Sequence, residues 1–140
     1  MKTTIKWAGD VKFEAKSGSG HTVIIDGPPE HGGKNQGVRP MEMLLMGVGG
    51  CASFDVIHIL TKSRQDVVDC VTTVDAERVD AVPAVFSTIH LHFVVSGNNL
   101  KENLVARAVE LSAEKYCSAS IMLAKAGVEM THSHEIVPVV

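Results

Sequence analysis

Aromatic side chains are scarce in this sequence, and positive charge is not in excess. Phe, Trp and Tyr make up 4% of the 140 residues, and 13 Lys and Arg stand against 16 Asp and Glu, for a net charge of −3. Proteins that hold nucleic acids present a basic surface to the phosphates, often with aromatic side chains that stack on the bases. The composition therefore argues against nucleic acid as a partner.

Long uncharged apolar runs and a regular cysteine pattern are also missing. The first residues, Met-Lys-Thr-Thr-Ile-Lys-Trp, lack the apolar run of a signal peptide, and no segment reaches the roughly 18 uncharged apolar residues needed to span a bilayer. Cys51, Cys70 and Cys117 form neither a disulfide framework nor a zinc-ribbon pattern. We therefore expect a cytoplasmic protein with no membrane contact, in which a distant pair of cysteines would serve transient redox chemistry.

The order of periodic segments predicts an α+β fold in a single domain over residues 1–140. Short strands are expected within 3–26, followed by a Gly- and Pro-rich loop over 27–38 and a long helix over 40–64. Two long strands, expected to pair antiparallel, should follow at 66–79 and 85–95. A helix over 100–115, a second short helix and a closing strand over 128–136 complete the order β-β-β-α-β-β-α-α-β.

The helix over 40–64 is the segment around which the chain is organised. Pro40 suits the first helical position, where its missing N–H would have had no partner. Gly47, Gly49 and Gly50 are three of the four residues directly before Cys51. Each costs roughly 1 kcal/mol of helix stability relative to alanine. We interpret them as positions where another backbone, or a substrate, comes close to Cys51.

Cys51 is the first candidate for chemistry. The nucleophile in redox reactions is the thiolate, and a residue in the middle of a helix has no free backbone donors to stabilise one. Arg39, at the helix start beside Glu42, could supply the positive charge, yet twelve residues at about 1.5 Å each put it roughly 18 Å from Cys51 along the axis. Either the helix breaks at its glycines, or Arg39 reaches Cys51 from an antiparallel copy in a dimer.

Each of these residues also has a structural interpretation. A buried free cysteine often acts as a small apolar residue, Arg39 can be a solvated surface charge, and Glu42 suits the first turn of any helix because of the helix dipole. Cys117 should lie at the start of the short second helix, whose first N–H groups would stabilise a thiolate. Cys70 falls on the inward face of a strand, and we interpret it as structural.

The histidines offer a competing interpretation. His90 and His92, and likewise His132 and His134, each place two imidazoles on one face of a strand, a spacing that metal sites use. Asp55 and His58 also lie four and seven residues after Cys51. No carboxylate or thiol sits at a companion short spacing to the histidine pairs, so we expect no metal ion and no other cofactor.

The motif Pro40-Met-Glu-Met-Leu-Leu-Met-Gly-Val-Gly-Gly-Cys51, the second thiol in Lys115-Tyr-Cys117-Ser-Ala-Ser, and the order of strands and helices around them resemble the OsmC/Ohr family. The resemblance spans nearly the whole chain. The segments Ala113-Glu-Lys-Tyr-Cys-Ser and Ser63-Arg-Gln-Asp-Val-Val-Asp-Cys70 are most similar to its YhfA-like branch. It implies an intertwined homodimer in which long central helices pack on curved antiparallel sheets, with two sites at the interface.

The resemblance also implies thiol-dependent reduction of organic hydroperoxides in oxidative stress defence. Cys51 would then be the peroxidatic thiol and Cys117 the resolving thiol, with an external dithiol as reductant. The family places a catalytic Glu directly after the helix-opening proline, where this chain has Met41, with Glu42 one residue later. The family's thiolate-holding Arg comes from the N-terminal strands, but residues 1–38 contain no arginine and Arg39 is the nearest.

From these residues we predict a catalytic set of Cys51, Cys117, Arg39 and Glu42, with Gly49, Gly50 and Met41 contacting the substrate. The alternative is a non-catalytic dimer that binds a small apolar or thiol ligand in the interface pocket.

Overall fold

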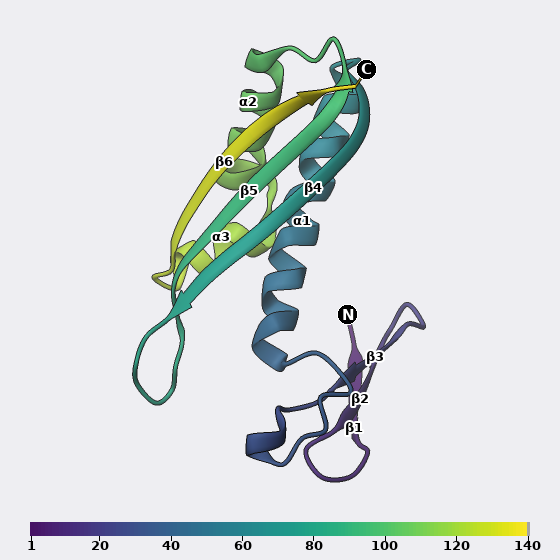
Figure 1. The fold of residues 1–140 in the computed structure, drawn as a ribbon, viewed down its shortest axis with the longest axis vertical. Helices are drawn as coiled ribbons and strands as arrows, with labels where there is room; N and C mark the ends of the chain where they lie inside the picture. Colours follow the sequence, from purple (N-terminus) through teal and green to yellow (C-terminus); the bar gives the residue numbers. More distant parts are fainter. Residues whose placement is uncertain (140) are drawn as a thin grey trace. The chain divides into compact units, whose positions relative to one another are not determined.

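The computed structural model describes residues 1–139, whose contacts group into two compact units, Met1–Leu44 and Leu45–Val140. We describe each unit by itself. The first unit holds a three-stranded antiparallel sheet in the order β1-β2-β3, made of β1 (Thr3–Trp7), β2 (Phe13–Ser17) and β3 (Thr22–Ile25). A short 3-10 turn, η1 (Pro29–His31), lies in the loop that follows (Figure 1).

Asp26 organises that loop. Its side chain is 2% exposed and accepts hydrogen bonds from the backbone N–H groups of Gly27, Lys34 and Gln36 at 2.7, 3.1 and 3.1 Å. The hydrogen bond from Gln36 is the largest of the effects that hold the pKa of Asp26 below its usual value. One carboxylate therefore replaces the backbone partners that a loop without regular structure lacks.

Helix α1 (Pro40–Lys62) runs without interruption through its glycines. The Glu42 carboxylate accepts a hydrogen bond of 2.8 Å from the Arg39 backbone N–H, as the glutamate of a capping box does. The predicted proline start is confirmed. Of the two ways in which Arg39 could approach Cys51, the break at the glycines is absent from this helix.

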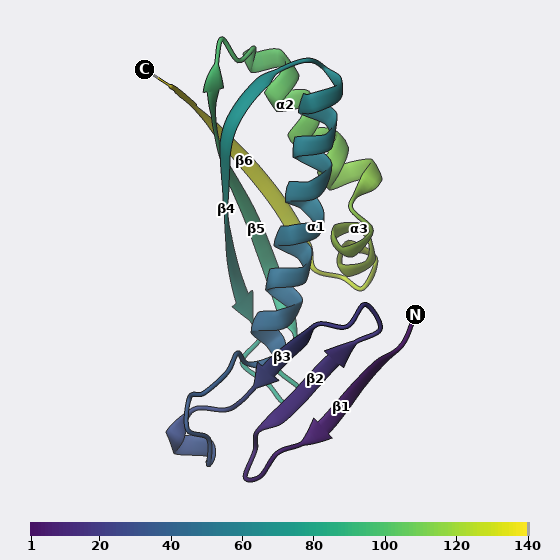
Figure 2. The same ribbon diagram turned by 90° about the vertical axis from the view of Figure 1, so that its right-hand side faces the viewer.

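The second unit is a two-layer arrangement of helices on one sheet. β4 (Asp66–Arg78), β5 (Phe86–Asn98) and β6 (Glu129–Pro138) form the sheet, and α2 (Glu102–Leu111) and α3 (Ser118–Lys125) lie with α1 on one of its faces (Figure 2). Ile89, Leu91, Phe93 and Val95 of β5 are 0–1% exposed and form the centre of the core. The predicted α+β fold and the predicted order of elements are confirmed.

Two details of this sheet differ from the sequence expectation. β4 and β5 pair antiparallel as predicted, but β6 pairs parallel to β5. The segment between β5 and β6 contains both helices and carries the chain back along the sheet, as a parallel crossover requires. A register shift between Val67 and Asp69 also turns Val68 outward, so that its side chain is 58% exposed rather than on the inward face we expected.

The helical segment after β5 also departs from one regular helix. The sequence predicts a helix over 100–115. β5 instead extends to Asn98, and α2 starts at Glu102. From Ser112 to Tyr116 the chain forms a π-helical turn, η2. Such turns replace the regular i→i−4 bonds and re-aim the residues that follow them.

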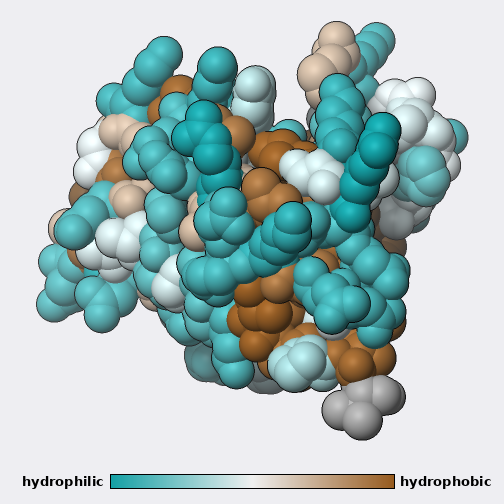
Figure 3. All heavy atoms as spheres, turned by 90° about the horizontal axis from the view of Figure 1, so that it is seen from above, coloured by the Kyte–Doolittle hydropathy of each residue, from teal (hydrophilic) through white to brown (hydrophobic). Residues whose placement is uncertain are grey.

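Helix α1 meets the length and composition criteria for a membrane span, with 28% of the relevant window buried. Our sequence expectation counted only uncharged runs, and Glu42 and Asp55 divide this one. The core helices of proteins that never enter a membrane meet the same criteria, so this is weak support for a span. Other apolar side chains also reach the surface, where they appear as brown patches among hydrophilic ones in Figure 3.

Candidate functional site

Cys51 lies in the middle of α1, at the border of its buried face. Val48, Ala52 and Val56 are at most 1% exposed, whereas Cys51 itself is partly exposed. The Ser112 hydroxyl donates a hydrogen bond of 3.0 Å to the Ala52 carbonyl oxygen, which ties the π-helical turn to α1 one residue beyond the thiol. Cys51 therefore lies next to a point where α1 is tied to the π turn, and its side chain remains partly exposed to solvent.

Cys117 is the N-cap residue of α3, as predicted. Its Sγ accepts a hydrogen bond from the Ser120 backbone N–H at 3.4 Å, and its own N–H donates to the Ser112 carbonyl oxygen at 2.8 Å, closing the π turn. The side chain is fully buried. Burial raises the pKa of the Cys117 thiol, and the nearby Cys51 adds to this, while the N–H and the hydroxyl of Ser120 nearby oppose it.

The structure brings the two predicted thiols together. Figures 1 and 2 both show α3 beside α1. The Sγ atoms of Cys51 and Cys117 and a carboxylate oxygen of Asp55 all lie within 4.8 Å of one another. A disulfide needs a sulfur separation near 2.05 Å, so rotation of the side chains would still have to close part of this distance. All three cysteines are free thiols here.

Asp55 was not among the predicted catalytic residues. It lies four residues after Cys51, and this spacing puts both side chains on the same face of the helix. Burial raises the pKa of the Asp55 carboxyl, against smaller opposing effects of His58 and of the Ser112 hydroxyl. Its Oδ2 is buried and has no hydrogen-bond partner among residues 1–139. The i+4 spacing was the only sequence signal for it.

The same three side chains are the one set of three His, Cys, Asp or Glu donors within residues 1–139 that could hold a metal ion. Neither histidine pair belongs to it. The His90 ring bonds Thr131 at 2.6 Å and Ser133 at 2.8 Å, and the His92 ring bonds Ser133 at 2.6 Å. These imidazoles are therefore engaged with hydroxyl groups on the neighbouring strand.

Cys70 stays apart from the cluster. It points to the inward face of β4, as expected, and burial raises the pKa of its thiol. Together with Gly50, Ser53, Phe54 and other α1 side chains it lines an open hollow of about 440 Å³. The Phe54 side chain is 71% exposed beside this hollow.

The glycines before Cys51 divide into two kinds. A Cβ on Gly49 would lie 2.9 Å from Val74 Cγ2 of β4, whereas a Cβ on Gly47 or Gly50 would meet nothing within 4 Å among residues 1–139. At Gly49, the close neighbour is a strand side chain and not the backbone that we predicted as one possibility. No substrate is needed to explain that glycine, while the space beside Gly50 is open.

Arg39, Met41 and Glu42 belong to the first unit, Met1–Leu44. The Arg39 guanidinium donates from Nη1 to Asn35 Oδ1 at 2.9 Å and to the Gly37 carbonyl oxygen at 3.1 Å. With Glu42 bonded to the Arg39 backbone, both charged residues hold the loop and the helix start within that unit. Their predicted roles at the thiol remain predictions.

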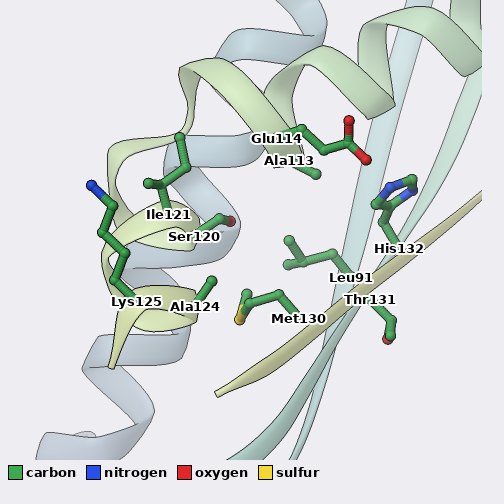
Figure 4. Close-up of a pocket in the computed structure, with 10 residues that line it drawn as sticks. All are labelled: Leu91, Ala113, Glu114, Ser120, Ile121, Ala124, Lys125, Met130, Thr131 and His132. Carbon is green, nitrogen blue, oxygen red and sulfur yellow. The ribbon is translucent and has the colours of Figure 1, made fainter. Parts of the chain in front are cut away.

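A pocket of about 470 Å³ that the sequence did not indicate lies between the helices and the sheet of the second unit. Figure 4 shows its lining, which includes Glu114, Ser120, Ile121, Met130 and His132. Its volume falls in the range of small-molecule sites. The Ser120 residue is 2% exposed and its Oγ has no hydrogen-bond partner within the described residues. Because Ser120 also donates its N–H to Cys117, one residue joins the pocket wall to the thiol.

Comparison with known proteins agrees with this architecture. The Escherichia coli K12 protein YhfA is 48% identical over 137 residues, which cover 98% of both chains. A crystal structure of a hypothetical protein from Aquifex aeolicus VF5 matches with a TM-score of 0.86 and 29% identity, covering 99% of this chain and 97% of that one.

An organic hydroperoxide resistance protein OsmC from Legionella pneumophila shares the fold, with a TM-score of 0.69 at 17% identity over 96% of this chain and 97% of that one. The sequence model of the family described as OsmC-like protein matches residues 33–133. Together with the full-length similarity to YhfA, this match shows that the chain belongs to the OsmC-like protein family.

Proposed function

We propose that this protein reduces organic hydroperoxides with the thiols of Cys51 and Cys117, in defence against oxidative stress. The observation that carries the proposal is the proximity of the two sulfur atoms, which lie within 4.8 Å although 66 positions separate them in the chain. Two solved relatives of the same fold are named as organic hydroperoxide resistance proteins, from Legionella pneumophila and Bacillus subtilis.

The chemistry divides into three balanced steps. The Cys51 thiolate attacks the distal oxygen of the hydroperoxide, the O–O bond breaks, and Cys51 becomes a sulfenic acid, while the departing alkoxide takes up the proton that the Cys51 thiol had released and leaves as an alcohol. The Cys117 thiol then attacks the Cys51 sulfur, a disulfide forms, and the hydroxyl leaves as water. An external dithiol reduces the disulfide and becomes a disulfide itself.

The proposed enzyme is a cytoplasmic homodimer with the site completed across the interface. Met46 and Phe54 of α1 are large apolar side chains, yet 57% and 71% of their surface is exposed. Exposed apolar side chains of this kind are typical of a surface that another protein chain covers. An antiparallel copy of α1 could cover this face and bring Arg39 to the partner's thiol. Arg39 would then stabilise the thiolate, Glu42 would hold Arg39 in position through its backbone N–H, and Gly50 and Met41 would contact the substrate.

Intact-mass analysis after one equivalent of cumene hydroperoxide tests the proposal. The wild-type protein and the control variant Cys70→Ser should each lose two hydrogens as the disulfide forms. Cys117→Ser should instead gain one oxygen at Cys51, and Cys51→Ser should keep its mass. An unchanged mass of the reduced wild-type protein, with its thiols still free, would overturn the proposal.

The pocket in Figure 4 favours a second candidate function, the binding of a small molecule without catalysis. Its lining combines apolar side chains with the polar ends of Glu114, Lys125 and His132, which suits a small ligand that is largely apolar and carries a polar group. An unchanged mass in the peroxide experiment would favour this candidate.

A further inference from the structure

Asp55 lies with Cys51 and Cys117 in one cluster, but the proposed cycle gives it no role. Its carboxylate lies within 4.8 Å of both sulfur atoms, and its place one helical turn after Cys51 fixes it on the same face of α1. A carboxyl group held against two thiols is unusual for a structural role, because it makes no ion pair there and leaves one buried oxygen without a partner among residues 1–139.

The second step of the cycle needs two proton transfers at this place. The Cys117 thiol must lose its proton to become a nucleophile, and the hydroxyl on the Cys51 sulfenic acid must gain a proton to leave as water. Cys117 is fully buried, and burial raises the pKa of its thiol. Bulk water therefore has little access to take the proton from the Cys117 thiol, and a base close to the thiol is required.

The other neighbours of Cys117 cannot act as that base. The Ser120 N–H and the Val48 carbonyl oxygen, at 3.4 and 4.0 Å from Sγ, stabilise or orient the sulfur but do not exchange protons. His58 lies seven residues after Cys51, but it is exposed and its ring stacks on Phe54 with centroids 6.0 Å apart. Within residues 1–139, Asp55 is the carboxyl group that lies with both sulfur atoms in one cluster.

We propose that Asp55 transfers the proton in the resolving step, from the Cys117 thiol to the hydroxyl that leaves Cys51. The carboxylate takes the proton as the Cys117 sulfur attacks, the S–O bond of the sulfenic acid breaks, and the carboxyl returns the proton to the departing hydroxide, which leaves as water. Protons and electrons balance without another reactant, and Asp55 ends as it began. The inference rests on the proposed hydroperoxide reduction.

The burial of Asp55 suits this exchange. A solvated aspartate is a weak base near neutral pH because its carboxylate is the stable form. Burial raises the pKa of Asp55, so the protonated form lies closer in free energy to the carboxylate, as efficient proton transfer requires. The unpartnered Oδ2 is available to receive the proton.

The test separates the first step from the second. Reduced protein is mixed with one equivalent of cumene hydroperoxide in the presence of dimedone, which traps sulfenic acid, and samples are resolved by intact mass over time. The variants are Asp55→Asn, Asp55→Ser and Asp55→Glu, and the matched control is Glu110→Gln, which removes an exposed helical carboxylate. Thermal unfolding shows which variants are folded. If Asp55→Asn does not fold, the kinetic test uses Asp55→Ser instead.

We expect the disulfide to form about 100-fold more slowly in Asp55→Asn and Asp55→Ser, the lower end of the effect of a general acid or base. Trapped sulfenic acid should accumulate, while its rate of formation stays at the wild-type value. Asp55→Glu should restore part of the rate of disulfide formation, and Glu110→Gln should keep the wild-type rate. A residue with only a structural role would not produce this pattern.

Two results would overturn the inference. A folded Asp55→Asn variant that forms the disulfide at the wild-type rate would remove Asp55 from the step, and a variant whose sulfenic acid forms slowly would place it elsewhere. In both cases the wild-type protein still oxidises, so the proposed function stands. A wild-type protein that neither forms sulfenic acid nor loses two hydrogens would instead overturn both.

Discussion

The glycine beside strand β4 allows a prediction whose magnitude follows from one distance. In Gly49→Ala the new methyl group would lie 2.9 Å from Val74 Cγ2, so one of the two must move by about 0.5 Å to reach an ordinary contact. Val74 is β-branched and has few rotamers open to it. We expect a packing cost of about 1–3 kcal/mol, as for other insertions into filled cores.

Gly47→Ala is the matched control, since its methyl group meets nothing within 4 Å among residues 1–139. Both substitutions gain about 1 kcal/mol of helix propensity. Gly47→Ala should therefore stabilise the protein by up to about 1 kcal/mol, and Gly49→Ala should be less stable than Gly47→Ala by the packing cost of about 1–3 kcal/mol.

Urea unfolding followed by circular dichroism measures both free energies of unfolding. The double variant Gly49→Ala/Val74→Ala should show a favourable coupling of about 1 kcal/mol or more, because the smaller side chain removes the clash. If Gly49→Ala proved as stable as Gly47→Ala, Val74 would not be the reason for this glycine, and a substrate contact would become the better explanation.

Two further predictions concern stability. The pKa of Asp26 is lowered in the folded state, so the stability that Asp26 adds is present above its ordinary pKa of 3.8 and is lost as the pH falls through the folded pKa. Asp26→Asn should therefore remove this part of the acid unfolding transition, which the fluorescence of the single tryptophan, in β1, can follow. Ser112→Ala should cost about 1 kcal/mol in urea unfolding by removing the hydrogen bond to Ala52, whereas Ser118→Ala, at an exposed position, should leave the free energy unchanged.

Local pattern was sufficient for the elements of this fold but not for how they pair. Alternation located β4 and β5, and Cys117 was correctly placed at the start of α3, because these features depend on neighbouring residues. The parallel pairing of β6 depends on the path of the intervening helices. The outward turn of Val68 depends on a register shift against the partner strand, which alternation within one strand cannot reveal.

The candidate site shows the same division. Each thiol was found from its own surroundings, but their proximity joins the middle of α1 to the start of α3, and no spacing along the chain encodes it. The family resemblance supplied the pairing. The π turn that carries Cys117 to α1 depends on a hydrogen bond from Cys117 back to Ser112, and Asp55 was visible only as a carboxylate one turn after Cys51.

The different exposure of the two thiols gives the proposed cycle a direction. Cys117 is fully buried, whereas Cys51 is partly exposed, so within one chain both the peroxide and the external dithiol must attack at Cys51. Reduction of the disulfide at Cys51 then releases Cys117 as the leaving thiolate, and a thiolate leaves faster when it is better stabilised. The Ser120 N–H at 3.4 Å stabilises the thiolate and offsets part of the opposing effect of burial on the Cys117 pKa. The proton that the attacking dithiol loses then returns the buried Cys117 thiol to its neutral form for the next cycle.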